Sequence, residues 1–226
     1  MSIAVVAGAS GGVGAALVRA LREQGAFEDV VALARSGEPA FDITGEDSIA
    51  AAAQALAGRE VRLVIDATGF LHDERFQPEN SLRQLDPAHM LHSFKVNAMG
   101  PALMMKHFLP LCPREGRFVF ATLSARVGSI TDNKLGGWHS YRASKSALNQ
   151  FMRTAAVELG RTRPQAICVC LHPGTVDTRM SQVFAKQGLD VRPPDVAAAD
   201  LLRVIEGLTP QQTGGFFDFK GEVVPF

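Results

Sequence analysis

The stretch IAVVAGASGGVGAALVRALREQG, residues 3–25, decides how this chain is interpreted. It begins with a run of small and β-branched residues typical of a buried parallel strand, and it ends with apolar residues on one helical face that stop at Gly25. Between them stands the glycine-rich segment GASGGVG, residues 8–14. A strand, a glycine turn and a helix in this order predict a dinucleotide-binding unit, because small residues let the backbone approach a pyrophosphate and the helix N-terminus attracts its charge.

The glycine spacing separates two kinds of phosphate site. The pattern is GxxxGxG, and no lysine follows as a Walker-type loop requires, so a P-loop is excluded. The alternative to dinucleotide binding is a glycine-rich turn without a ligand. If the segment binds a dinucleotide, the residues expected to contact it are Gly8, Ser10, Gly12, Val13 and Gly14.

Short apolar runs alternate with longer helical patterns along the rest of the chain, which is typical of a parallel sheet with helices on both faces. The predicted strands are residues 3–7, 30–33, 40–43, 61–67, 117–123, 166–171 and 216–219. We therefore expect an α/β protein with a Rossmann-type, doubly wound parallel sheet of seven strands, in a single domain over residues 1–226. Residues 179–193 lack periodicity and are expected to form a substrate loop.

The composition excludes several classes of protein. The 226 residues are 46% hydrophobic and 20% charged, which is enough for a folded core, and 23 basic residues balance 23 acidic ones. A balanced charge does not favour nucleic acid or an anionic membrane as a partner, and no apolar stretch is long enough to cross a bilayer. The three cysteines lack the spacing of a disulfide framework, and His89 and His92 lack a third ligand, so we expect a cytoplasmic protein without a metal.

The end of the second predicted strand indicates which cofactor is bound. An NAD site usually has an acidic residue here to bind the ribose 2′-hydroxyl, whereas this chain has Arg35, whose guanidinium suits a 2′-phosphate. NADP, as NADPH, is therefore favoured over NAD, with a solvated loop arginine as the alternative. Asp42, with Ile43 beside it, is expected to meet the adenine; a capping carboxylate before Thr44 is the alternative for Asp42.

Tyr141 and Lys145 form a candidate pair for proton transfer. They stand four residues apart, so a helix places them on the same face. A phenol with a pKa of about 10 is a poor acid or base near neutral pH, and a neighbouring ammonium lowers that value by stabilising the phenolate. We expect Tyr141 to exchange a proton with the substrate and Lys145 to make that exchange possible.

Asn97 lies in a predicted helix, four residues before Pro101. Proline has no N–H to donate to the carbonyl four residues earlier, so the main-chain carbonyl of Asn97 needs another partner. We expect a bound water there that relays protons between Lys145 and solvent. A simple kink at Gly100 and Pro101 is the alternative.

These motifs, in this order, resemble the short-chain dehydrogenase/reductase family over essentially the whole chain. Two further stretches carry the resemblance: DATG at residues 66–69 is similar to the family's NNAG motif, and PGTVDT at residues 173–178 is similar to its PGxVxT loop. The segments SARVGSI at residues 124–130 and GGW at residues 136–138 are most similar to the C-factor branch of the family.

The resemblance implies a Rossmann fold and an NADP-linked carbonyl reductase. It implies that Tyr141 is the acid–base residue, that Lys145 holds the nicotinamide ribose, and that Asn97 supports the proton relay. It also implies further cofactor contacts, at Ala67, Thr68, Gly69, Pro173, Gly174, Val176 and Thr178. A homodimer or homotetramer, formed through the helices that carry Asn97 and Tyr141, is implied as well.

One departure from the family pattern bears on activity. The catalytic serine usually stands three residues before the glycine that is Gly128 here, and that position is Ala125. We expect Ser124 to supply the missing hydroxyl, with Ser129 as the alternative, since the loss of such a donor costs rate. Asp66, which stands where the family has asparagine, is a milder departure.

We therefore predict an enzyme, an NADP(H)-dependent oxidoreductase that transfers a hydride between nicotinamide and a small carbonyl or alcohol substrate. Trp138 and His139 are candidates to line the substrate pocket. The apolar side chains of the expected substrate loop favour a hydrophobic substrate; they are Met180, Val183, Phe184 and Leu189.

Two other functions are compatible with a nucleotide-binding fold. The first is an NAD(P)-binding signalling or regulatory protein with little turnover, which the fold cannot distinguish from a reductase. The second is a sugar-nucleotide epimerase, which we disfavour because 226 residues leave no room for a separate substrate domain.

Overall fold

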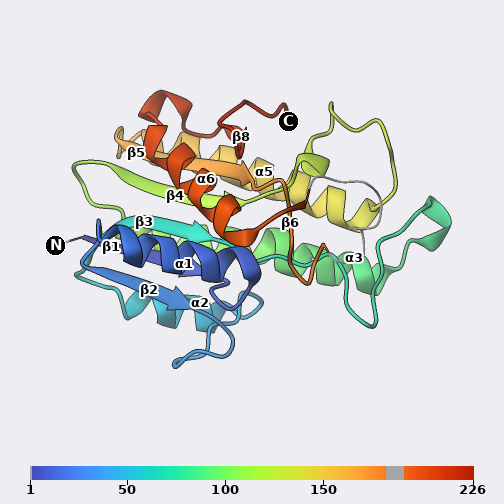
Figure 1. Ribbon diagram of the computed structural model, residues 1–226, viewed down its shortest axis with the longest axis horizontal. Helices are drawn as coiled ribbons and strands as arrows, with labels where there is room; N and C mark the ends of the chain where they lie inside the picture. Colours follow the sequence, from blue (N-terminus) through green and yellow to red (C-terminus); the bar gives the residue numbers. More distant parts are fainter. Residues whose placement is uncertain (1, 182–190) are drawn as a thin grey trace.

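Six parallel strands form the central sheet in a computed structural model that describes residues 2–181 and 191–226 (Figure 1). From one edge to the other they are β2 (Asp29–Leu33), β1 (Ser2–Ala7), β3 (Glu60–Asp66), β4 (Phe118–Leu123), β5 (Ala166–His172) and β8 (Phe216–Asp218). The chain passes from β1 to β2 on one side and then returns to β3 on the other. Open α/β sheets bind ligands at such a reversal, outside the carboxyl ends of the strands.

Helices cover both faces of this sheet. In Figure 1, α1 (Gly12–Gln24) and α6 (Pro194–Gly207) lie in front of the strands. The opposite face is covered by α2 (Glu46–Gln54), α4 (Gly100–Phe108) and α5 (His139–Gly160), and α3 (Pro87–Phe94) packs against α5. The predicted α/β class and the Rossmann-type, doubly wound parallel sheet are therefore confirmed.

Alternate residues of each strand face opposite cores, which explains why the strands are apolar throughout. In β1, Val5 belongs to the core under α2, α4 and α5, whereas Val6 belongs to the core under α1 and α6. In β5, Cys168 and Val169 divide between the two cores in the same way. Both cores end at the carboxyl edge of the sheet, where polar residues begin.

The predicted strand over residues 40–43 is wrong, and the sheet has six strands instead of seven. The backbone donors of this segment are bound locally: Phe41 N donates to the Ala34 carbonyl at 2.9 Å, and Asp42 N donates to Ser48 Oγ at 2.9 Å. Phe41 and Ile43 are buried in the core from a loop. Because both are buried, this segment shows the alternating apolar pattern of a strand, but within the described residues it forms no hydrogen bonds to a neighbouring strand.

Two short paired strands escape the sequence prediction. They are β6 (Thr175–Val176) and β7 (Val191–Arg192), which pair in parallel beside the main sheet. β6 precedes the predicted substrate loop at residues 179–193, whereas β7 lies within it; Val183, Phe184 and Leu189 of that loop lie outside the described residues.

The helix that carries Asn97 widens instead of ending. A π-helical turn, Lys95–Met99, joins α3 to α4, and Gly100 N donates to the Lys95 carbonyl five residues earlier. Asn97 is fully buried within this turn, and Pro101 stands at the beginning of α4. The proline that predicts a kink is thus accommodated by a π turn, a feature common at functional sites.

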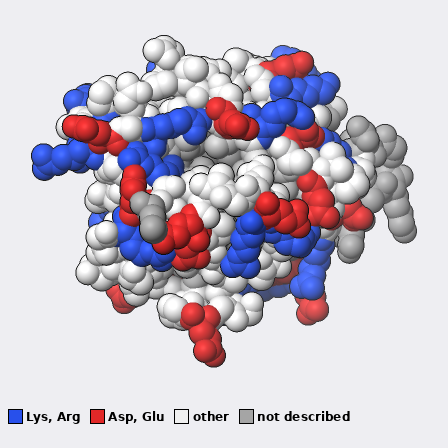
Figure 2. Space-filling model, turned by 60° about the vertical axis from the view of Figure 1, so that its left-hand side comes forward, with Lys and Arg blue, Asp and Glu red and all other residues white. Residues whose placement is uncertain are grey.

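The surface carries both signs of charge. Figure 2 shows basic and acidic side chains interspersed over one face of the molecule, in keeping with their equal numbers in the sequence. Within the described ranges, none of the helices combines the length and the apolar character that a membrane crossing would need.

Candidate active site

The glycine-rich turn between β1 and α1 is tightly packed. Gly8 has a φ of 78°, in the left-handed region that favours glycine, and its carbonyl accepts a hydrogen bond from Gly11 N at 2.9 Å. A Cβ atom on Gly14 would lie 2.2 Å from the Gly8 carbonyl oxygen. A Cβ atom on Gly12 would lie 2.7 Å from Cγ2 of Thr178. The glycine-rich segment therefore packs the beginning of α1 against Thr178, which is also a predicted cofactor residue.

The N-terminus of α1 suits an anion. Its N-cap residue, Gly11, makes no side-chain hydrogen bond to the helix, and the first turn contains no acidic residue. The backbone N–H groups at this end are therefore available, and together with the helix dipole they attract negative charge. The backbone around Gly8, Gly12 and Gly14 is bare, so the residues present fit the pyrophosphate of a dinucleotide.

Two charged residues after β2 differ in their contacts: Arg35 forms no side-chain bond among the described residues, whereas the Asp42 carboxylate is hydrogen-bonded to Thr44. Arg35 is exposed, and no other group in the described part of the chain forms a hydrogen bond or ion pair with it. Asp42 Oδ1 accepts hydrogen bonds from the amide and the hydroxyl of Thr44, both at 2.8 Å, as the capping alternative predicts. The bond from the Thr44 amide is the main cause that lowers the pKa of Asp42. Ile43 is buried, and its carbonyl oxygen approaches Gly100 closely.

A buried carboxylate closes the end of β3. Asp66 is fully buried; its Oδ1 accepts from Thr68 N at 3.0 Å and from Thr68 Oγ1 at 2.6 Å, and its Oδ2 accepts from Thr122 Oγ1 at 2.8 Å. Thr122 is not among the predicted site residues. A hydroxyl in the otherwise apolar strand β4 needs a buried partner, and that requirement is the signal by which the sequence could have identified it.

Gly69 brings the loop after β3 to Asn97 and Lys145. A Cβ atom on Gly69 would lie 3.7 Å from Asn97 Oδ1 and 3.8 Å from Lys145 Nζ. The Asn97 side chain holds this loop in place: Oδ1 accepts from Phe70 N at 2.8 Å, and Nδ2 donates to the Phe70 carbonyl at 2.7 Å. Nδ2 also donates to Ser144 Oγ on α5 at 3.1 Å. The structure thus brings three of the predicted residues together.

Tyr141 and Lys145 lie on the buried face of α5. Lys145 Nζ donates to the Leu123 carbonyl at the end of β4 at 2.7 Å and lies 6.0 Å from the centre of the Tyr141 ring. Burial lowers the pKa of Lys145 to about 8, against the opposing effects of Asp66 and Cys170. The expected lowering of the Tyr141 pKa is not found: burial raises it above its ordinary value, so the hydroxyl keeps its proton at neutral pH.

Both alternative serine hydroxyls are hydrogen-bonded to groups other than this pair. Ser124 is buried, and its Oγ donates to Asn149 Oδ1 of α5 at 2.7 Å. Ser129 is buried as well, and its Oγ accepts from Asp132 N at 3.2 Å. Ala125, at the position of the family's serine, is partly exposed. A catalytic role for Ser124 stays a prediction, without support from its hydrogen bond.

The loop after β5 is rigidly held near the glycine turn. Gly174 has a φ of 80°, and a Cβ atom there would lie 3.2 Å from the Phe219 ring. Arg192 of β7 donates to the Pro173 carbonyl at 3.2 Å, and its guanidinium lies 3.9 Å from the centre of the Phe219 ring. Val176 is buried in β6. The predicted cofactor residues of this loop therefore have a fixed backbone.

Apolar side chains border the pair. The ring centres of Trp138 and Tyr141 lie 6.3 Å apart, and Met180 Cε comes within 3.5 Å of the position that a Cβ atom on Gly69 would occupy. His139 is partly exposed in the first turn of α5. These contacts are compatible with the predicted pocket lining by Trp138 and Met180.

His89 and His92 pack against an aromatic ring. Phe76 stacks on both, with ring centres 5.0 Å from His89 and 5.6 Å from His92. Across residues 2–181 and 191–226, no cluster of histidine, cysteine and acidic side chains has the makeup of a metal site.

Comparison with known proteins identifies the family. The family model described as enoyl-(acyl carrier protein) reductase matches residues 7–192. The C-signal protein of Myxococcus xanthus is 36% identical over 147 residues, which cover 65% of this chain and 84% of that protein. The 1-hydroxy-2-glutathionyl-2-methyl-3-butene dehydrogenase of Rhodococcus sp. (strain AD45) is 32% identical over 227 residues, with 96% of each chain covered.

A solved structure of similar fold is also that of a reductase. The NADPH-bound carbonyl reductase from chicken fatty liver superposes with a TM-score of 0.85 at 25% identity, over 100% of this chain and 98% of that one. The predicted resemblance to the family, with its C-factor branch, is confirmed by these matches. The chain belongs to the short-chain dehydrogenase/reductase family of oxidoreductases, whose members bind nicotinamide cofactors.

Proposed function

We propose that this protein is an NADP(H)-dependent carbonyl reductase, and that Tyr141 supplies the proton. One observation carries the proposal. Lys145 and Asn97 lie beside Gly69 at the carboxyl end of the sheet, and the phenol ring of Tyr141 lies next to Lys145. Three motifs far apart in the sequence meet there. Such a group of titratable and polar residues at the switch point of an α/β sheet is the arrangement expected of an active site.

Each residue has a separate role in the proposed reaction. Tyr141 keeps its proton at neutral pH and donates it to the substrate oxygen as the carbonyl is reduced. Lys145 is largely an ammonium below its pKa of about 8, so its charge favours the transfer and its donors suit the nicotinamide ribose. Asn97 fixes the loop after β3 against α5, so that both groups keep their places. When bound, the reduced nicotinamide supplies the hydride.

The cofactor would lie along the carboxyl edge of the sheet. We assign its pyrophosphate to the bare backbone at the N-terminus of α1 and its nicotinamide side to the rigid loop after β5. The residues proposed to hold it are Gly8, Ser10, Gly12, Val13, Gly14, Arg35, Asp42, Ile43, Ala67, Thr68, Gly69, Asn97, Tyr141, Lys145, Pro173, Gly174, Val176 and Thr178. Asp42 and Ile43 contribute through backbone position, because the Asp42 carboxylate is bonded to Thr44 and Ile43 is buried.

The substrate is proposed to be a small, largely apolar carbonyl compound or the corresponding alcohol. Trp138 and Met180 support an apolar pocket, and the similar chicken structure is that of a carbonyl reductase. The Rhodococcus relative is named as a dehydrogenase of a glutathionyl butene alcohol, which indicates that relatives of this chain act on alcohol carbons. We assign the reaction to one domain over residues 1–226, in the cytoplasm.

The test of the mechanism is NADPH oxidation with a panel of aldehydes, ketones and quinones. Tyr141→Phe keeps the ring and removes the hydroxyl, so kcat falls about 100-fold or more because the proton donor is lost. NADPH affinity, measured by titration calorimetry, falls far less than kcat, because the ring packing is unchanged and the other proposed cofactor contacts remain. Turnover that survives Tyr141→Phe undiminished contradicts the mechanism.

The choice of cofactor rests on Arg35. Arg35→Ala weakens NADPH binding about tenfold to a hundredfold, because charge-assisted hydrogen bonds to a 2′-phosphate contribute about 1.5–3 kcal/mol. NADH binding is unaffected, since NADH lacks that phosphate. Lys134→Ala, which removes another exposed cation, serves as the control. Calorimetry that gives equal losses for the two cofactors contradicts the assignment.

A nucleotide-binding regulatory protein with little turnover is the second candidate. Ala125 favours it, because this position lacks the hydroxyl that usually polarises the substrate carbonyl, and neither Ser124 nor Ser129 replaces it directly. The C-signal relative, by its name, is also in keeping with signalling. NADPH binding without oxidation on any member of the panel would favour this candidate over the reductase.

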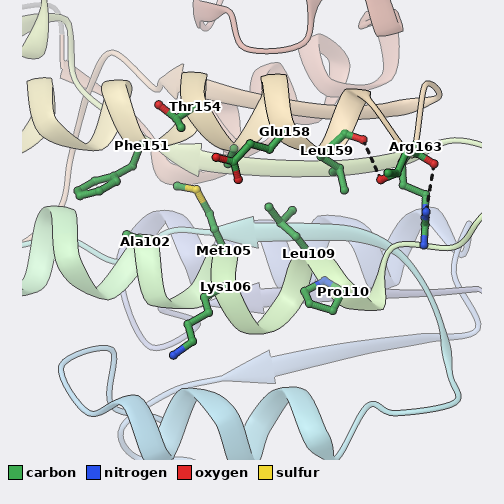
Figure 3. A pocket seen from close by; sticks show the side chains of 12 residues that line it. Ala102, Met105, Lys106, Leu109, Pro110, Phe151, Thr154, Glu158, Leu159 and Arg163 are labelled. Atoms are coloured by element: carbon green, nitrogen blue, oxygen red, sulfur yellow. Dashed lines mark hydrogen bonds between the residues drawn. The ribbon is translucent and has the colours of Figure 1, made fainter.

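We also propose that the protein forms a homodimer or homotetramer through α4 and α5. A groove of about 520 Å³ runs between these helices, and Figure 3 shows Met105 of α4 and Leu109, just after α4, facing Phe151 and Leu159 of α5 across it. Phe151 is 45% exposed, unusually high for a phenylalanine. A second copy that packs helix on helix would cover this apolar groove.

A further inference from the structure

The helix that carries Tyr141 has no cap of its own. α5 begins at His139, and its N-cap residue, Trp138, makes no side-chain hydrogen bond to the helix. Trp138 also has a φ of 51°, in a region that residues other than glycine seldom occupy. Tyr141 is the third residue of this helix, so it lies in the turn that an uncapped terminus leaves least secure.

The missing cap comes from a distant carboxylate. Glu79 accepts hydrogen bonds from the Ser140 amide, at 3.2 Å, and from the Ser140 hydroxyl. Its main-chain carbonyl accepts a third bond, from Trp138 N at 2.5 Å. Gly137 permits this approach, because a Cβ atom there would lie 3.3 Å from the Glu79 carbonyl oxygen. Glu79 therefore binds Trp138 and Ser140, two of the three residues that precede Tyr141.

The hydrogen bonds between Glu79 and Ser140 are buried, and one of the partners is charged. Glu79 and Ser140 are 2% and 1% exposed. Burial acts to raise the pKa of Glu79, but the hydrogen bonds from Ser140 outweigh it and hold the pKa below its usual value, so the group is a carboxylate at neutral pH. His89 Nδ1 lies 3.3 Å from Glu79 Oε1 and joins α3 to the same cluster. A buried charge held by several partners fixes geometry closely.

We propose that Glu79 is a positioning residue for Tyr141, acting through Ser140 and the first turn of α5. The inference rests on the proposed function, since it gives that function's proton donor its place. The same cluster reaches α3 through His89, and the helical segment that continues from α3 carries Asn97. The carboxylate therefore fixes the positions of Tyr141 and Asn97 relative to each other. A displacement of the reacting groups by about 1 Å costs a rate on the order of 100-fold.

The test compares Glu79→Gln with Glu74→Gln, its exposed neighbour on the same loop. Both Glu79 oxygens accept from Ser140, whereas glutamine is uncharged and has one acceptor oxygen, so the charge-assisted bonds to Ser140 are weakened. We expect kcat of carbonyl reduction to fall about tenfold to a hundredfold. The KM for NADPH changes much less than kcat, because the glycine turn and Arg35 are untouched. Ser140→Ala, which removes only the hydroxyl bond, gives a smaller fall.

Amide hydrogen exchange supplies a readout that does not depend on turnover. In Glu79→Gln the amides of residues 139–142 exchange faster, while amides of the central sheet exchange at the wild-type rate. Glu74→Gln changes neither the kinetics nor the exchange. If Glu79→Gln does not fold, Ser140→Ala carries both measurements.

Three results would overturn the proposal. They are wild-type exchange at residues 139–142 in a folded Glu79→Gln, an unchanged kcat, or a fall in kcat that is matched by a loss of NADPH affinity and of melting temperature. The last result would show a general structural role. If the wild-type protein reduces no carbonyl at all, the proposed function fails, and the exchange data alone then decide whether Glu79 holds the first turn of α5.

Discussion

At the scale of single residues, the charge on Lys145 depends on a departure from the family pattern. The family has asparagine where this chain has Asp66, and the Asp66 carboxylate is fully buried at the end of β3. Lys145 is 3% exposed, and burial lowers its pKa to about 8. Asp66 opposes that effect, as does Cys170, whose own pKa burial raises. The carboxylate therefore helps Lys145 to remain an ammonium inside the protein.

Asp66→Asn should move the pH at which activity is lost. The Lys145 ammonium is present below its pKa and disappears as the pH rises through it, so activity that needs the charge falls at alkaline pH. Without the carboxylate the pKa of Lys145 drops further, so activity at a pH of about 8 falls about fivefold while activity at acidic pH is kept. The measurement is kcat against pH, with Asp47→Asn, an exposed acid of α2, as the control. An alkaline limb that does not move contradicts the role of Asp66.

The residues that could be predicted are those whose role follows from local spacing. Tyr141 and Lys145 share a face because a helix brings every fourth residue together, whatever the rest of the fold. The role of Ser124 could not be predicted in this way, because its partner, Asn149, is supplied by a helix that begins 15 residues later in the chain. Glu79 could not be predicted for the same reason, since its hydrogen bonds to Ser140 join elements that only the folded chain brings together.

At the scale of elements, long buried strands and the helices between them could be predicted from apolar patterns, and the exceptions share a cause. The segment at residues 40–43 has the pattern of a strand, but its donors bind within the loop around Ala34 and Ser48. The strands β6 and β7 are too short for any pattern to appear. In each case the hydrogen bonds between backbone groups determine whether a segment is a strand, and the apolar pattern alone does not show where those bonds form.

The π turn before α4 illustrates the same limit within a helix. Pro101 predicts that the regular bonding must fail near Asn97, and it does fail, but the chain responds with a wider turn instead of a break. Gly100 makes this response possible, since a Cβ atom there would lie 2.4 Å from the Ile43 carbonyl oxygen. The position of the failure could be predicted from the sequence; its form depends on how closely α4 packs against the loop after β2.

At the scale of the whole molecule, the order of the strands determines which motifs meet. The sequence indicates parallel strands joined by helices, but the placing of β1 between β2 and β3 requires pairings that the chain order does not specify. That placing brings the glycine turn, Gly69 and Lys145 to one edge. The family resemblance carried this information, because motifs that recur together in one order imply one topology.

The groove between α4 and α5 leads to a prediction about assembly. Light scattering of the wild-type protein is expected to give at least twice the 24.2 kDa mass of the chain. Phe151→Glu places a charge in the apolar groove and should yield the mass of a single chain, because a buried unpaired charge is costly. Val196→Glu, at a similarly exposed residue of α6, should leave the assembly intact. A wild-type protein with the mass of one chain contradicts the prediction.

The pairing of Trp138 with Tyr141 makes this site its own optical reporter. The chain contains one tryptophan and one tyrosine, and their ring centres lie 6.3 Å apart. Tryptophan emission from this protein thus originates at Trp138, next to the proposed proton donor, without interference from indoles or phenols elsewhere. Quenching of that emission reports on the surroundings of Tyr141 in unlabelled protein.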